Sequence, residues 1–165
     1  MRSTQNKIVT PATLPARDGL GKVGVCTGCY DILQSGHAVF FEQCKEFCDT
    51  LIVVVGNGAA VAKLKPGRPL NPDPNRLFLV AALEAVDFAL IGDEELLPGK
   101  IDCYSLCDQL TPDVYILNDD DSGLAEKRAF CEARGIKLEL VSRVVPAGLI
   151  PTSTTDIAEK LRNAD

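Results

Sequence analysis

LIVVVG, residues 51–56, is the stretch that decides the fold of this chain. The run is rich in β-branched residues and continuously apolar, with no polar residue at alternate positions. A strand that is covered on both faces, as in a parallel sheet between two helix layers, has this pattern, whereas a half-exposed strand alternates. The stretch therefore predicts a buried parallel strand in an α/β domain.

Further apolar runs and helical stretches surround this strand. The runs at 21–25, 88–91 and 114–117 predict strands, and the alternating run at 137–141 predicts one nearer the sheet edge. Stretches of helical period predict helices at 35–48, 73–86, 124–134 and 153–162. Strand and helix alternate about five times. This order predicts a single-domain, Rossmann-like α/β fold, a doubly wound parallel sheet of about five strands.

Capping residues set the ends of three of these helices. Asp73 precedes a proline and predicts an N-cap, and Ser153 with Asp156 three residues later has the spacing of a capping box. Gly135 is expected to end the helix before it.

Composition restricts the class of protein. The chain has 165 residues and 46% hydrophobic content, which suits one core, and its net charge of -6 argues against nucleic-acid binding. No apolar run reaches the roughly 20 residues of a membrane span, and no secretory signal is visible, so we expect a cytoplasmic protein without a membrane partner. Residues 1–20 lack periodicity and predict a flexible N-terminal arm before a folded domain at 21–165.

Seven cysteines, an odd number, predict free thiols in a reducing compartment. Cys26, Cys29, Cys44 and Cys48 have a spacing close to that of a structural zinc site. Cys44 and Cys48, however, fall on the apolar face of the expected helix, which favours core packing over metal binding.

The loop TGCYDILQSGH, residues 27–37, joins the first strand to the first helix and holds the only histidine. A doubly wound sheet places phosphates at such a junction, where Gly28 allows close approach and the amides around Ser35, Gly36 and His37 are expected to face outward. His37 adds a side-chain donor. The glycines fit neither the dinucleotide fingerprint nor the P-loop, and local capping by the histidine is the plainer alternative.

This loop resembles the signature of the nucleotidylyltransferase superfamily, as found in cytidylyltransferases and in the nucleotidyl-transferring domain of heptose-phosphate enzymes. Gly28, Cys29, Tyr30 and Asp31 match its first half, and Gly36 and His37 match its end. The resemblance continues in order through VVVGN, GRPLNPDPNR, AALEAVDFALI and STTDI, and so covers residues 22–162.

The resemblance implies an enzyme that joins CTP or ATP, with Mg2+, to a phosphorylated sugar or polyol and releases pyrophosphate, and it implies a homodimer. No side chain is assigned as a protein ligand of the metal. His37 and Arg76 are implied to be catalytic, Arg76 by neutralising phosphate charge. The implied nucleotide-binding residues are Thr27, Gly28, Cys29, Tyr30, Asp31, Gly36, Asn57, Ser153, Thr154 and Thr155.

Two departures from the family pattern leave alternatives open. Gln34 stands where the family has its first histidine, and because glutamine carries no charge the chain is either an enzyme in which Gln34 replaces that histidine or a nucleotide-binding sensor without catalysis. The segment NDDDS, 118–122, stands where the family often has a Lys-Gly-x-Asp type segment. Its Asn118, Asp119 and Asp121 are candidates to bind acceptor hydroxyls or help hold Mg2+, or they form a solvated acidic turn.

Overall fold

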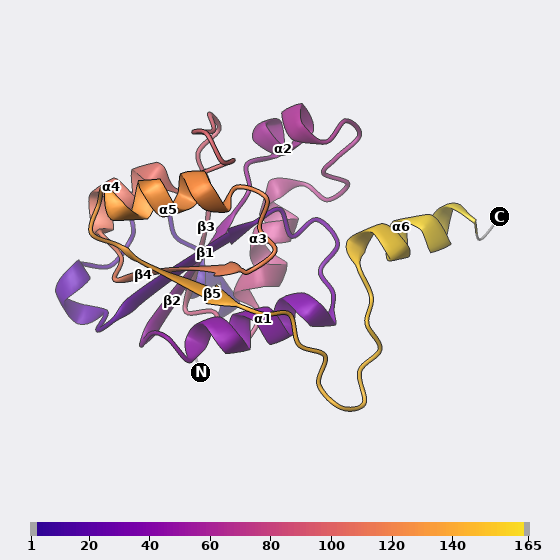
Figure 1. Ribbon diagram of the computed structural model, residues 1–165, viewed down its shortest axis with the longest axis horizontal. Coiled ribbons are helices and arrows are strands. Elements are labelled where there is room, and N and C mark those ends of the chain that lie inside the picture. The colour runs from indigo at the N-terminus through magenta and orange to yellow at the C-terminus, as the bar shows by residue number, and fades with distance from the viewer. Residues whose placement is uncertain (1–2, 164–165) are drawn as a thin grey trace.

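The computed structural model describes residues 3–163 and contains a five-stranded parallel sheet in the order β3-β2-β1-β4-β5 (Figure 1). The strands are β1 Val23–Gly28, β2 Thr50–Val55, β3 Phe88–Ile91, β4 Val114–Asn118 and β5 Lys137–Val141. The fold prediction is confirmed: one α/β domain is doubly wound about its first strand.

Helices cover both faces of the sheet (Figure 1). On one face lie α1 and α3, and on the other α4 and α5, while α2 follows β2 and α6 ends the chain. Their bounds are α1 Ser35–Lys45, α2 Gly58–Leu64, α3 Asp73–Ala81, α4 Tyr104–Leu110, α5 Leu124–Glu132 and α6 Thr154–Arg162.

Strand β2 shows why its sequence is uniformly apolar. All six of its residues are buried, and successive side chains enter opposite hydrophobic cores. Ile52 and Val54 pack in the core that includes α4 and α5 residues, whereas Leu51 and Val53 pack in the core of α1 and α3. By contrast β5 lies at the sheet edge, as predicted, but its Leu140 is 37% exposed, although the alternation placed it on the apolar face with Leu138.

Some element ends differ from the sequence prediction. Helix α1 ends at Lys45 rather than residue 48, and α2 was not predicted. Asp73 does not cap α3, because its carboxylate instead accepts hydrogen bonds from the Gly58 backbone N–H at 3.0 Å and from Arg76 at 2.7 Å. The Ser153 capping box of α6 is present as predicted.

Residues 3–20 pack against the domain, which differs from the expectation of an arm with little structure of its own. Two 3-10 turns, Thr4–Lys7 and Arg17–Gly19, lie in this segment. Ile8 bridges to Ala89 of β3 in parallel, and Val9 is buried. The segment therefore extends the β3 edge of the sheet.

Two further findings bear on the class of protein. Among residues 3–163, no helix has the length and apolar character needed to cross a membrane. All seven cysteines are free thiols, and five of them are buried. The described residues contain no cluster of three or more His, Cys, Asp or Glu side chains placed to hold a metal ion, so the zinc-like spacing does not form such a cluster.

The sheet order creates a crevice. Strand β1 has β2 on one side and β4 on the other, so the connections after β1 and β4 leave the sheet in opposite directions. Ligands of open α/β sheets bind outside the carboxyl ends of strands at such a switch point. The loop 27–37 follows β1, and the acidic segment 118–122 follows β4.

Candidate active site

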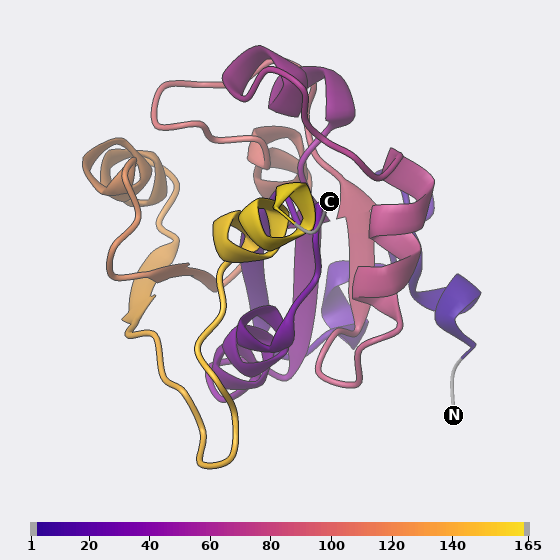
Figure 2. The same ribbon diagram turned by 90° about the vertical axis from the view of Figure 1, so that its right-hand side faces the viewer.

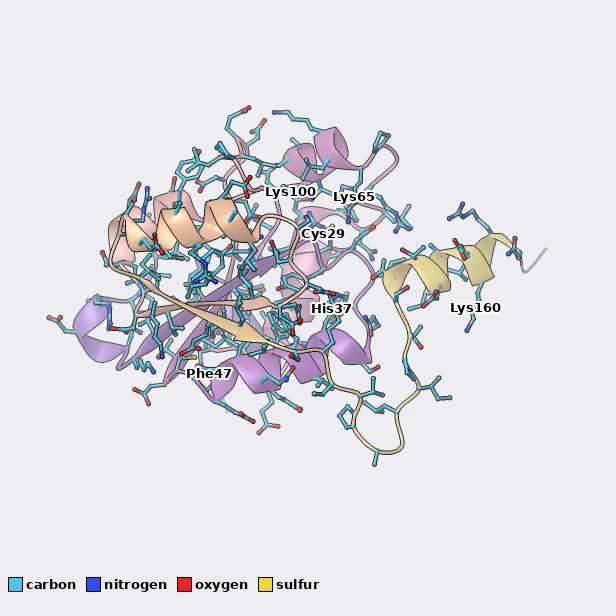
Figure 3. The ribbon with its side chains drawn as sticks, viewed as in Figure 1. Cys29, His37, Phe47, Lys65, Lys100 and Lys160 are labelled. Atoms are coloured by element: carbon cyan, nitrogen blue, oxygen red, sulfur yellow. The ribbon has the colours of Figure 1, made fainter. Side chains whose placement is uncertain are left out.

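Two adjoining cavities open at this switch point. The loop cavity, about 520 Å³, is lined by the loop 27–31 together with Lys65, Arg68 and Asp121. The C-terminal cavity, about 550 Å³, is lined by Gln34, Asp120 and much of residues 143–156. Figure 3 shows Cys29, His37 and Lys65 at the end of the sheet that faces α6. Both cavities share Gly36, His37, Phe40, Asn118, Arg143, Thr154 and Thr155.

His37 stands at the junction of the cavities with a defined tautomer. Its Nδ1 accepts the backbone N–H of Gln34 at 3.2 Å, so in the neutral ring the proton lies on Nε2, which can donate to a ligand. Burial, and secondly the positive charge of Arg143, hold the pKa of His37 below its ordinary value. The imidazole is therefore a neutral hydrogen-bond donor at neutral pH.

Gln34 is the N-cap of α1, which explains its position three residues before His37. Its side-chain Oε1 accepts the Gly36 N–H at 2.6 Å, and its backbone carbonyl accepts the His37 N–H at 2.9 Å. The expectation that these two amides face outward is wrong, because Gln34 already bonds both. A phosphate at this helix end would have to compete with the Gln34 side chain.

Tyr30 and Gly28 fix the shape of the loop. Tyr30 adopts a left-handed backbone conformation with φ of 50° and lays its ring over Gly28, where a Cβ would lie 2.6 Å from the ring. The ring then meets His37 edge-on at 5.4 Å between centroids, and Phe41 at 5.1 Å. Gly28 is thus required for the close approach of the aromatic ring that positions His37.

Asp31 fastens the loop to the segment before α3. Its buried carboxylate accepts the backbone N–H groups of Leu70 and Asn71, each at 2.8 Å, and the guanidinium of Arg68 at 2.8 Å. Burial raises the pKa of Asp31, but the two amides and Arg68 outweigh it and leave the pKa below its usual value. Asp31 lines the loop cavity but has its carboxylate committed to the protein.

Arg76, predicted to neutralise phosphate charge, is not brought to either cavity. Its side chain is fully buried and donates to the carbonyls of Cys29, Gly56 and Asn71 and to the carboxylate of Asp73. A buried guanidinium so bonded joins the chain ends of β1 and β2 to α3 and has no free edge toward a ligand. The cations that line the cavities are Lys65, Arg68 and Arg143.

Of the other predicted nucleotide-binding residues, some line a cavity and one has a structural role outside both cavities. Thr27 and Cys29 line the loop cavity, where burial raises the pKa of the Cys29 thiol. Asn57 lies outside both cavities and caps α2 through a bond from the Ala59 N–H at 2.9 Å.

The residues at the start of α6, which the resemblance implied to bind nucleotide, line the cavities. Thr154 and Thr155 line both cavities and Ser153 lines the C-terminal one. The Thr154 hydroxyl lies 3.5 Å from the Ile32 carbonyl, which links α6 to the loop 27–37. Figure 1 and Figure 2 together show α6 beyond the carboxyl ends of the strands, with its start nearest the domain.

The residues of the acidic segment after β4 differ in which cavity they line. Asn118 lines both cavities and Asp121 the loop cavity, where Asp121 pairs with the buried Lys127 at 2.7 Å. Asp119 instead accepts the Ser142 hydroxyl and lines neither cavity. Sequence reasoning missed Asp120, which lines the C-terminal cavity and pairs with Arg143. Its position among three aspartates was the available signal.

Asp102 was also missed, because nothing in its sequence context marks it. Asp102 is 7% exposed, and within residues 3–163 its Oδ1 has no hydrogen-bond partner. Burial raises the pKa of Asp102 to about 6. An ionised carboxylate at this place costs stability at neutral pH.

The sequence of this chain is similar to a known family and to proteins within it. A family model described as cytidylyltransferase-like matches residues 25–160. "Bifunctional protein HldE" of Pseudomonas fluorescens is 38% identical over 139 residues, 82% of this chain and 27% of that protein. The protein of the same name from Nitratiruptor is 39% identical over 97 residues, 58% of this chain and 20% of that protein. This chain thus spans at most about a quarter of these two relatives.

A solved structure agrees in fold. The lipopolysaccharide core biosynthesis protein from Thermoplasma volcanium superposes with a TM-score of 0.63 at 26% identity. The match covers 76% of this chain and 98% of that one.

Proposed function

Since the chain belongs to the cytidylyltransferase-like family, we propose that it is a nucleotidyltransferase that joins NMP from CTP or ATP to a phosphorylated sugar or polyol. The observation that carries the proposal is the placement of His37, Thr154 and Thr155 on both cavities, so that one set of donors faces two adjoining compartments. A transfer between two bound substrates needs such a shared wall.

The reaction suits these residues. An oxygen of the acceptor phosphate attacks the α-phosphorus of the nucleotide, the bond to the bridging oxygen breaks, and pyrophosphate leaves with that electron pair. The attacking oxygen is already anionic, so no general base is required. The protein then contributes positioning and charge stabilisation.

Each group has a task in this scheme. The Nε2–H of His37 donates to a phosphate oxygen at the junction, and the hydroxyls of Thr154 and Thr155 hold the β- and γ-phosphates. Lys65, which lies exposed on the rim of the loop cavity, neutralises acceptor charge. Mg2+ would come with the triphosphate, whose oxygens are ligands that this ion prefers.

The substrate classes rest on likeness. The similar Thermoplasma protein is named for lipopolysaccharide core biosynthesis, and this name supports a sugar-derived acceptor. The C-terminal cavity joins apolar residues, among them Val144, Leu149 and Ile150, to the polar groups of α6, and so suits a nucleoside, which has both kinds of surface.

One observation favours a second candidate, a nucleotide-binding protein with little or no turnover. The Gln34 side-chain oxygen accepts the Gly36 amide, so only its neutral NH2 group could donate to a phosphate, and a neutral donor is weaker than a charged histidine. The substitution Gln34→His tests this candidate. A gain of about a hundred-fold in pyrophosphate release would mark weakened catalysis, the size expected for one restored transition-state donor. No gain would show that Gln34 is not what limits turnover.

Thermal unfolding with each of the four NTPs and Mg2+ tests the proposal. A ligand at 100 times its Kd stabilises the folded state by about 2.7 kcal/mol, whether or not it reacts. We expect a selective rise in Tm with CTP or ATP that His37→Ala removes and that Glu42→Ala, an exposed change on the same helix, preserves. No rise with any NTP would contradict the proposal.

A further inference from the structure

Arg143 and Asp120 form an ion pair on the wall between the cavities. Arg143 follows β5 and Asp120 follows β4, so the pair joins two neighbouring loops. Nε donates to Oδ2 at 2.8 Å and Nη2 to Oδ1 at 3.2 Å. Among residues 3–163 no hydrogen bond engages Nη1, so one edge of the guanidinium remains available for a ligand.

The pair is exposed and therefore easily exchanged. The side chain of Arg143 is 67% exposed and that of Asp120 56%. Ion pairs in such surroundings contribute little to stability because water and salt screen them. A carboxylate that accepts from an arginine on two oxygens has the same acceptor pattern as a phosphate, which can replace it.

The remaining cations do not serve the junction in this way. Arg76 is buried, Arg68 is bound to Asp31, and Lys65 lines the loop cavity alone. Arg143 is the one Lys or Arg side chain among the described residues that lines both cavities. It also acts electrostatically on His37, which places its charge near the imidazole.

We propose that Arg143 is the residue that binds nucleotide phosphate beside His37, and that Asp120 holds it in the free protein as an internal competitor. This proposal rests on the proposed function and adds to it the cation that Gln34 and Arg76 do not provide. When a nucleotide enters, the guanidinium exchanges Asp120 for phosphate oxygens. The competing carboxylate lowers affinity for every anion that binds there, including free pyrophosphate.

Calorimetric titration of CTP, ATP and inorganic pyrophosphate into five proteins, the unchanged chain and four variants, tests the inference. Arg143→Gln should weaken binding about ten-fold or more, as expected for a lost charge-assisted bond. Asp120→Asn should tighten it by up to about five-fold, the worth of an exposed pair. The double variant should match Arg143→Gln, because the carboxylate competes only for that arginine.

Arg134→Gln is the matched control, since Arg134 pairs with Asp108 at 2.8 Å and neither residue lines a cavity. Its affinities should equal those of the unchanged chain. If Arg143→Gln also binds as well as the unchanged chain, the inference is wrong and the proposed function stands. A gain from Asp120→Asn that persists without Arg143 would show simple charge repulsion and overturn the competitor role. If the unchanged chain binds no nucleotide, both proposals fail.

Discussion

Arg76 and Arg143 use the same side chain for opposite purposes. Arg76, fully buried, donates to three backbone carbonyls and one carboxylate and joins the ends of β1, β2 and α3. Arg143, mostly exposed, holds a single aspartate beside an open cavity. The frame around the loop 27–37 thus has its charges committed to the protein, whereas the C-terminal side of the site keeps its charge available. Arg76 thus holds the site together, whereas Arg143 is placed to meet a ligand.

The strongest way to break this comparison is Arg76→Ala. The change removes the donor of three backbone carbonyls and leaves the Asp73 carboxylate with the Gly58 N–H as its remaining donor among the described residues, and we expect a loss of about 3–5 kcal/mol in the free energy of unfolding. Denaturant titration measures it. Arg128→Ala, at an exposed position on α5, should change stability by less than about 0.5 kcal/mol. Equal losses in the two variants would mean that Arg76 has no special structural part.

Asp102 tests whether the interior near the site contains a carboxyl group that lowers the stability of the fold at neutral pH. Burial raises the pKa of Asp102 to about 6 in the fold. The folded state is therefore favoured fully below about pH 4, where the group is protonated, and this contribution to stability is lost as the pH rises through 6. Asp102→Asn should therefore raise the free energy of unfolding at pH 7.5 by up to roughly 3 kcal/mol. The gain should shrink at pH 5. A gain independent of pH would contradict the burial of an ionising carboxyl.

A smaller effect is expected from Asp31→Asn. The change removes the negative partner of Arg68 and one of the two carboxylate oxygens that fasten the loop 27–37 to residues 68–71. We expect a loss of roughly 1–2 kcal/mol at pH 7, since charge-assisted bonds are replaced by neutral ones. The pKa of Asp31 is lowered, so its contribution is present above the ordinary carboxyl range and disappears as the pH falls through the folded pKa. The two chains should thus converge in acid denaturation curves. A stability difference between the two chains that grows toward low pH would argue against a stabilising role of the Asp31 carboxylate.

The sequence predicted the fold well because buried parallel strands and helix caps are local patterns. LIVVVG became β2, and the match of the cytidylyltransferase-like family confirms the resemblance seen in the ordered motifs. Ser153 caps α6 as its spacing indicated. Such features depend on residues close together in the chain, which is why they can be predicted without knowing the packing.

The site was harder, because side-chain partners come from distant segments. Arg76 bonds Cys29 and Gly56, 47 and 20 residues away, so no local pattern could show that it is buried. Arg143 meets Asp120 across two loops, a pairing that only the order of β4 and β5 creates. Gln34 was interpreted as a replaced catalytic group, but its capping bonds give it a structural part as well.

The central claim is that a phosphate binds at the junction of the two cavities, against His37. The chain contains one histidine, so proton NMR follows a single imidazole through a pH titration without ambiguity. In the free protein we predict a pKa below the ordinary 6.5, and with saturating pyrophosphate, CTP or ATP a clear rise, because a nearby anion favours the charged ring. An imidazole whose pKa and chemical shift stay unchanged in all three complexes would contradict the account.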